Sequence, residues 1–156
     1  MGEFVRPAVS PLIWYREPQA AIAWLEQAFG FERQLVVEDG AGGIIHSELV
    51  LDEGLIMVVG PPSGKAISPR AFGGRVTQSV HVQLKAGLDA HCARARAAGA
   101  QIEREPATQP YGDRVYTCLD LEDHPWSFGQ TVTVLSAAEV AKATGRRIHD
   151  RRQTHG

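Results

Sequence analysis

Residues 109–130, QPYGDRVYTCLDLEDHPWSFGQ, are the stretch from which the fold can be inferred. They open with a Pro-Tyr-Gly-Asp turn and continue into a run of β-branched and aromatic residues at 115–117. An acidic turn at 120–123 then leads into a second strand-like run that starts at Trp126. Two such runs joined by a tight polar turn predict a β-hairpin. A site is expected to border it, because it gathers four chemically capable side chains: Tyr111, Arg114, His124 and Trp126.

The chain before the hairpin predicts a strand, a helix and three strands. Pro18 suits the first turn of a helix, and Gly30 suits its end, where a left-handed backbone costs glycine little. Ile22, Leu25 and Phe29 lie at helical spacing between them. Turn residues separate the predicted strands, which cover residues 9–15, 31–38, 44–51 and 55–60.

The same order of elements then starts again after a connector at 61–77, whose first fifteen residues are rich in Pro, Gly and Ser. A loop of that length is often functional. Ser136 and Glu139 form a capping-box pattern that predicts a further helix to about Arg147, followed by a tail at 151–156. The second set of elements comprises strands at 78–84, 100–107, 113–119 and 125–135, with a helix at 86–98.

The two halves share one spacing. Gly30 and Gly99, each at the end of a predicted helix, are 69 residues apart, and so are Gly60 and Gly129 near the ends of the fourth and eighth strands. The sequence therefore predicts an α+β fold made of two βαβββ repeats, 9–60 and 78–135, within a single domain at 1–150. Each repeat has one sheet face to cover, so the repeats should pair around a cleft.

Composition excludes several classes of protein. The chain has 156 residues, 44% of them hydrophobic, which is enough for one core. A net charge of −2 gives no general attraction to nucleic acid or to anionic membranes. No apolar run approaches the ~20 residues that span a bilayer. The N-terminus does not resemble a secretory signal, and the two cysteines are expected to be buried and reduced. These features favour a soluble cytoplasmic protein.

The paired repeats resemble the vicinal oxygen chelate superfamily, which includes glyoxalase I, bleomycin-resistance proteins and extradiol dioxygenases. The segment AIAWLEQAFGFE at 21–32 is similar to the first helix of that family. HSEL at 46–49, and GDR at 112–114 followed by D-x-x-x-H-x-W at 120–126, resemble motifs of its glyoxalase-like branch. The resemblance covers about residues 9–135. It implies the fold, and it implies a homodimer, because family members commonly complete their clefts across two chains.

The resemblance also raises the question of a metal site. Metal-dependent members use His and Glu from the first, fourth, fifth and eighth strands. Here only His81, on the fifth, is a good donor, since the other positions fall on Ser10 or Leu12, Met57 or Val58, and Trp126 or Ser127. The usual metal site is therefore expected to be absent. A variant site could combine His46, Glu48 and His81, if the third strand faces the cleft.

Each candidate residue also has a structural interpretation. His81 can hydrogen-bond in a pocket without binding a metal. Glu48 can pair with Arg114 across neighbouring strands, because a buried carboxylate needs a cation. His124 is expected to order its turn. Trp24 is expected to pack, whereas Tyr15, Tyr111 and Trp126 are expected to border the cleft.

The leading hypothesis is a protein that binds a small, partly apolar organic molecule without metal or other cofactor. Its ligand-binding residues would be Tyr15, His81, Gln83, Tyr111 and Trp126. The alternative is a glyoxalase-type lyase, isomerase or dioxygenase with the variant metal site, in which Glu48 would also be the catalytic base. A third possibility is a subunit that mainly associates with other proteins. No nucleic-acid or membrane partner is expected.

Overall fold

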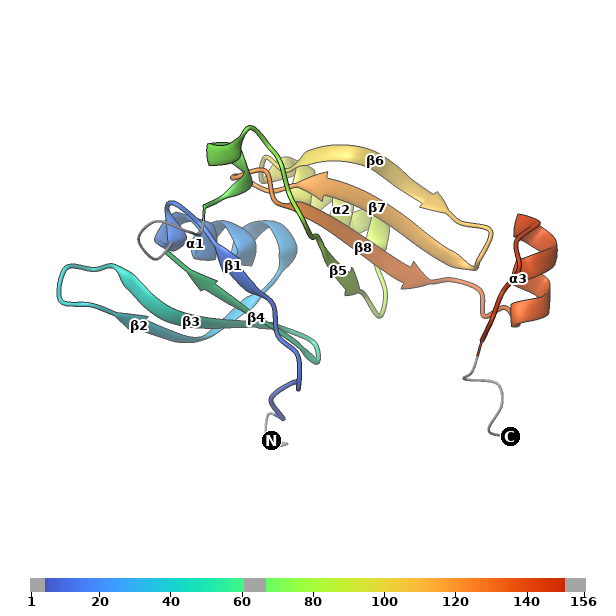
Figure 1. Cartoon of the computed structure of the whole chain (residues 1–156), viewed down its shortest axis with the longest axis horizontal. Helices are drawn as coiled ribbons and strands as arrows, with labels where there is room; N and C mark the ends of the chain where they lie inside the picture. The colour runs from blue at the N-terminus through green and yellow to red at the C-terminus, as the bar shows by residue number, and fades with distance from the viewer. Residues whose placement is uncertain (1–4, 61–66, 151–156) are drawn as a thin grey trace.

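The structure is a computed structural model that describes residues 5–60 and 67–150 (Figure 1). Its first module begins with strand β1 (Leu12–Trp14), and helix α1 (Pro18–Phe29) follows. Strands β2 (Glu32–Glu38), β3 (Ile44–Leu51) and β4 (Gly54–Val59) complete it. The four strands form one sheet in the order β1-β4-β3-β2, in which only β1 and β4 run parallel.

The second module repeats this arrangement. Strand β5 (Val80–Gln83) precedes helix α2 (Leu88–Ala97), and β6 (Gln101–Thr108), β7 (Asp113–Leu119) and β8 (Pro125–Thr131) follow. The sheet order is β5-β8-β7-β6, with β5 parallel to β8. Gly30 and Gly99 follow the two helices with φ of 79° and 95°, the left-handed conformation that the sequence predicted. The predicted α+β fold of two βαβββ units is therefore confirmed.

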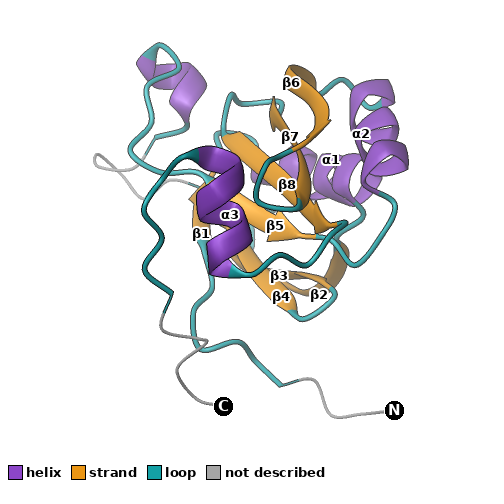
Figure 2. Ribbon diagram, turned by 90° about the vertical axis from the view of Figure 1, so that its right-hand side faces the viewer, coloured by secondary structure: helices purple, strands orange, loops and turns teal. Residues whose placement is uncertain are grey.

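Both modules share one core. Helices α1 and α2 contact each other on the same side of the sheets (Figure 2). Phe29, at the end of α1, packs against Trp126 and Phe128 of the second sheet, with ring centroids 5.1 and 4.8 Å away. His91 of α2 joins the modules further, because its ring nitrogens hydrogen-bond the Phe29 carbonyl and the Tyr116 hydroxyl. Burial lowers the pKa of His91, which keeps the ring neutral in this setting.

The helices cover only one face of each sheet. Alternation along β8 places Trp126 and Phe128 in the core and turns Ser127 to the opposite, open face. In the first sheet Leu49 faces the core, whereas Glu48 and its cross-strand neighbour Leu35 face the other way. These two open faces are the surfaces on which a site can be built.

Several element boundaries differ from the predicted ones. Strand β8 ends at Thr131 and does not continue to residue 135, because Val132 and Thr133 turn aside to donate their amides to the Gly112 carbonyl. The connector contains a short 3₁₀ helix, Pro69–Phe72, that the sequence did not predict. Helix α3 (Ala137–Thr144) has the predicted capping box but ends before Gly145. Residues 61–66 of the connector and the tail at 151–156 lie outside the described residues.

Within the described residues, no helix has both the length and the apolar character needed to cross a bilayer.

Candidate functional site

A row of polar side chains lies on the open face of the second sheet. We call it the shelf and define it as His81 and Gln83 of β5, Ser127 and Thr131 of β8, and Asp113 of β7. The parallel register pairs His81 with Ser127, and Asp113 pairs with Thr131 on the next strand. His81 Nδ1 lies 3.0 Å from Ser127 Oγ, and Nε2 lies 3.1 Å from Gln83 Oε1. Both ring nitrogens of His81 are therefore engaged within the shelf.

The shelf depends on Gly129, which lies between Ser127 and Thr131 on β8. A Cβ atom there would come within 2.8 Å of Gln83 Oε1 and 3.1 Å of His81 Cε1. Since Gln83 is the register partner of Gly129, the missing side chain lets the Gln83 and His81 side chains lie flat across β8. The glycine thus has a packing role at this site.

A hollow of about 230 Å³ lies beside the shelf, between the two modules. His81 and Gln83 line one side of it, and the turn between β3 and β4 lines the other. Apolar walls come from Phe31, Leu51 and Val80, whereas Asp52 and Glu53 stand at the turn and both pair with Lys85. The hollow therefore combines an apolar lining with a few polar groups, as small-molecule sites do.

Tyr15 and Trp126 do not line this hollow. Both are buried, with 0% and 1% of their surface exposed, and both donate hydrogen bonds to Asp120 Oδ2, at 2.5 and 3.0 Å. The expectation that they border a cleft and stack on a ligand does not fit this placement. Trp126 faces the core from β8 and Tyr15 faces it from the residue after β1, and the sequence alone did not determine these directions.

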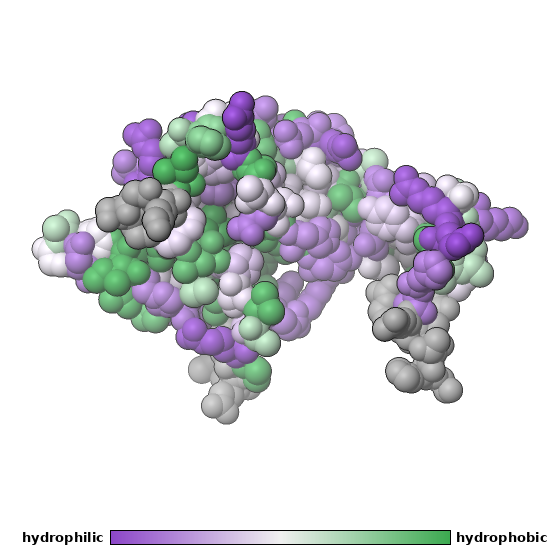
Figure 3. All heavy atoms as spheres, in the orientation of Figure 1, coloured by the Kyte–Doolittle hydropathy of each residue, from purple (hydrophilic) through white to green (hydrophobic). Residues whose placement is uncertain are grey.

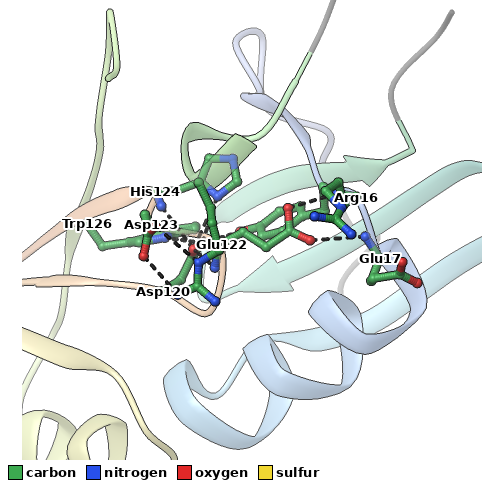
Figure 4. A network of polar contacts seen from close by, with 9 residues as sticks. Arg16, Glu17, Asp120, Glu122, Asp123, His124 and Trp126 are labelled. Atoms are coloured by element: carbon green, nitrogen blue, oxygen red, sulfur yellow. Dashed lines mark hydrogen bonds and ion pairs between the residues drawn. The ribbon is translucent and has the colours of Figure 1, made fainter. Parts of the chain in front are cut away.

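Asp120 is the centre of the network drawn in Figure 4. Its side chain is completely buried, and Oδ1 accepts from the amides of Glu122 and His124 and from His124 Nδ1. Burial alone would raise the pKa of Asp120, but the hydrogen bonds from His124, Tyr15 and Trp126 outweigh it, and the net pKa is lowered. His124 orders its turn, as predicted.

The same turn joins the two modules. Glu122 accepts hydrogen bonds from the amides of Arg16 and Glu17, at 2.8 and 3.0 Å, where helix α1 begins (Figure 4). Free amides at a helix start favour a carboxylate. The turn of the second module therefore caps the helix of the first module. This is a structural role, and it leaves Glu122 and Asp120 unavailable to a ligand.

His46 and Glu48 lie on the open face of the first sheet. Glu48 Oε1 is 3.0 Å from His46 Nε2 and 2.5 Å from Arg6 Nη2, and these two neighbours hold the pKa of the carboxyl below its usual range. The predicted pairing of Glu48 with Arg114 is wrong. Arg114 binds Asp89 of α2, because its strand belongs to the other sheet. Tyr111 lies in the turn between β6 and β7 and is 48% exposed.

Comparison with known proteins agrees with the geometry. The sequence model of the Glyoxalase/Bleomycin resistance protein/Dioxygenase superfamily matches residues 8–128, which cover the first module and the second as far as the middle of β8. The chain belongs to this superfamily.

Individual relatives of this glyoxalase superfamily protein carry little functional description. It is 29% identical over 143 residues to the uncharacterized protein Rv0887c of Mycobacterium tuberculosis, covering 89% of this chain and 83% of that one. TioX from Micromonospora sp. ML1 is 30% identical, with a TM-score of 0.64, and the match covers 83% of this chain and all of TioX. The fosfomycin resistance protein FosX from Listeria monocytogenes shares the fold, with a TM-score of 0.59, 14% identity, and coverage of 87% and 98%.

FosX has also been solved with Mn(II). A comparable site in this chain would need several nitrogen or oxygen ligands close to His81. The hydrogen-bond partners of His81 are the neutral side chains of Ser127 and Gln83. In the first module, β1 and β4 pair Leu12 with Met57 where β5 and β8 pair His81 with Ser127, and neither Leu12 nor Met57 is a good donor. One imidazole with neutral oxygen atoms does not fit a catalytic divalent ion. Among residues 5–60 and 67–150, no three His, Cys, Asp or Glu residues are placed to share an ion. His46 and Glu48 are therefore not brought together with His81 within this part of one chain.

The places of Ser127, Asp113 and Thr131 in the shelf were not predicted from the sequence. A signal was available for Ser127, since strand alternation places it on the face opposite its bulky neighbour Trp126. The register that sets it beside His81 became visible only with the paired strands.

Proposed function

We propose that this protein binds a small, partly apolar organic molecule in the hollow beside the shelf, without the divalent metal used by other members of its superfamily. The observation that carries the proposal is the setting of His81. Its ring lies at the edge of an apolar hollow, and its direct hydrogen-bond partners are neutral. A polar group of the ligand can replace Ser127 or Gln83 as the partner of one ring nitrogen, while Phe31, Leu51 and Val80 supply apolar contact.

One relative and the name of the superfamily support a ligand-binding role. FosX is a fosfomycin resistance protein, and the superfamily as a whole includes bleomycin resistance proteins. We propose His81 and Gln83 as the polar anchors. Tyr111, in the turn between β6 and β7, remains a predicted contact. Tyr15 and Trp126 act only indirectly in this proposal, by fixing the strands that carry the shelf.

A thermal-shift screen of small aromatic and heterocyclic compounds tests this proposal. At about 100 times its Kd, a ligand adds about 2.7 kcal/mol, which for a chain of this size raises Tm by about 5 to 10 °C. His81→Ala should weaken binding about tenfold, as expected for the loss of one hydrogen bond to a buried ligand group. His149→Ala, an exposed histidine outside the site, is the matched control.

Each shift should be remeasured after treatment with a chelator. A shift that survives supports metal-free binding. A shift that needs added metal and disappears with EDTA would contradict the proposal and would favour the metal-dependent lyase, isomerase or dioxygenase alternative. No shift with any compound would leave the ligand-binding function without support.

We also propose that the protein is a homodimer. On the open face of the first sheet, Leu12, Leu35 and Val37 have 37%, 42% and 39% of their surface exposed. Figure 3 shows hydrophobic surface over the first module. Apolar side chains gathered on a sheet face favour association. Sedimentation equilibrium should give twice the chain mass of 17.0 kDa.

A charged substitution locates that interface. Leu35→Glu should shift the dimer towards the monomer, because it would bury a carboxylate without a partner. Val134→Glu, at a position that is 89% exposed and outside both sheets, should leave the dimer intact. A monomeric wild-type protein would contradict the proposal, and so would an equal effect of both substitutions.

A further inference from the structure

The shelf fixes the proton positions of its own side chains. Gln83 Nε2 lies 3.0 Å from Thr131 Oγ1 and 3.5 Å from Asp113 Oδ2. An ionised carboxylate only accepts hydrogen bonds, so the amide nitrogen of Gln83, and not its oxygen, must face Asp113. The oxygen of Gln83 therefore faces His81 Nε2. An amide oxygen only accepts, so Nε2 of the neutral ring carries the proton.

The consequence reaches Ser127. With the proton on Nε2, Nδ1 of His81 is an acceptor, and the only hydrogen available in that contact is the Ser127 hydroxyl hydrogen. The 3.0 Å contact is therefore Ser127 Oγ–H donating to Nδ1. A hydroxyl that donates to an imidazole, whose other nitrogen is held by a third group, has the arrangement of an activated nucleophile. Ser127 is only half-buried, and His81 is exposed, so both can be reached from solvent.

We propose that Ser127 and His81 form a nucleophile–base pair that reacts with small activated acyl compounds. Gln83 and Asp113 are positioning residues, since they act through His81. The arrangement differs from a Ser-His-Asp triad in two respects: the base uses Nδ1, and a neutral amide stands between the ring and the carboxylate. Asp113 can still stabilise the charged ring, although at longer range.

The chemistry needs no further reagent besides water. Ser127 Oγ bonds to the carbonyl carbon of the ester, and its proton passes to His81 Nδ1. The bond to the leaving oxygen breaks, and the leaving group departs with that electron pair. It takes up the proton from Nδ1, or it leaves as an anion while Nδ1 loses its proton to solvent, so the ring is neutral again. Water then attacks the acyl-serine, gives a proton to Nδ1, and Ser127 Oγ leaves and recovers its proton.

Activated esters are the expected class of substrate. Preorganised hydrogen-bond donors that stabilise the oxyanion contribute much of the rate in ester hydrolysis. Ser127 lies on an open sheet face, where its neighbours are side chains of the adjacent strands β5 and β7. A good leaving group such as p-nitrophenolate lowers the need for such donors. The adjacent hollow of about 230 Å³ has room for a short acyl chain.

Labelling with an alkyl fluorophosphonate, read by intact mass and peptide mapping, tests the pair directly. We expect one label per chain, on Ser127, and no label on Ser127→Ala. His81→Ala should slow labelling about a hundredfold, within the range for loss of a general base. Thr117→Ala is the matched control. Thr117 is the register partner of Ser127 on β7, and within residues 5–60 and 67–150 the hydrogen bonds of His81 go to Ser127 and Gln83, so this variant should be labelled at the wild-type rate.

Gly129→Ala tests the positioning without removing any shelf group. Its new Cβ would press on the movable ends of Gln83 and His81, so the protein should fold while labelling slows at least tenfold. No label on the wild-type protein would overturn the proposal. A label that persists in Ser127→Ala, or a wild-type rate in His81→Ala, would overturn it as well.

This inference does not depend on the proposed ligand binding. Labelling of Ser127 can succeed where the thermal-shift screen finds no ligand, and a ligand can bind where Ser127 does not react. The turnover of p-nitrophenyl acetate by the wild-type protein and by Ser127→Ala gives a second readout. Equal turnover by both proteins would count against the proposed pair.

Discussion

Replacing Asp120 with alanine is expected to lower the free energy of unfolding by about 3 to 5 kcal/mol. The substitution removes the acceptor for the Tyr15 hydroxyl and the Trp126 indole, which are both buried. It also leaves the amides of Glu122 and His124 without the carboxylate. A buried donor that loses its partner costs about 1 to 3 kcal/mol, and these donors belong to one network, so their costs are not simply additive. Urea denaturation followed by tryptophan fluorescence measures the change.

Two further substitutions separate this effect from a general effect of charge. Asp120→Asn keeps one acceptor oxygen but places an NH₂ group against donors on its other side, and it should be destabilising to a smaller degree. Asp123→Ala, in the same turn, removes an ion pair with the exposed Arg70 and places alanine at φ of 68°, so it should cost less, about 1 to 2 kcal/mol. A loss from Asp120→Ala no larger than that from Asp123→Ala would show that the network does not hold the modules together.

The pH dependence of stability follows from the same carboxylate. The pKa of Asp120 is lower in the folded protein than its ordinary value of about 3.9. The stability that the ionised carboxylate contributes is therefore fully present above that ordinary value, and it is lost as the pH falls through the lower folded pKa. The difference in stability between wild type and Asp120→Ala should accordingly be present above about pH 4 and should shrink as the pH falls below it.

Local patterns predicted most of the fold, because they determine it directly. Gly30 and Gly99 end their helices in the left-handed conformation, and Ser136 with Glu139 forms the expected capping box. The 69-residue spacing predicted the duplication of modules, since each module uses the same turn chemistry. Strand β8 was predicted four residues too long, because the tertiary contacts of Val132 and Thr133 with Gly112 override their β-propensity.

The candidate site was predicted less well, because it depends on the face to which each strand turns. His81 and Gln83 were both named as candidate polar contacts, and they lie on one face of β5 because they are two residues apart on a strand. Tyr15 and Trp126 were expected at the cleft because their segments were expected to border it, but both side chains are buried in the core. Asp120 accepts hydrogen bonds from Tyr15 just after β1, from Trp126 of β8 and from its own turn, and such a convergence cannot be read from spacing.

Gly112→Ala should be the other strongly destabilising substitution, at about 3 kcal/mol or more. Gly112 has φ of 98°, a conformation that costs an L-residue about 1 to 2 kcal/mol. In addition, an added Cβ would come within 2.1 Å of the Thr133 carbonyl oxygen, which is backbone and cannot move aside without disturbing the chain. The amides of Val132 and Thr133 both bind the Gly112 carbonyl, so any displacement would also strain the end of β8.

Gly99→Ala is the matched control, because Gly99 has nearly the same backbone angle, φ of 95°, but open space around the position of its Cβ. Its cost should be the conformational one alone, about 1 to 2 kcal/mol. The difference between the two variants, measured by urea denaturation at one temperature, isolates the close approach of Gly112 to Thr133. Equal losses of stability would mean that the segment after β8 can shift at little energetic cost. A larger loss at Gly112 would mean that the β6–β7 turn fixes where β8 ends, and with it the position of Thr131 in the shelf.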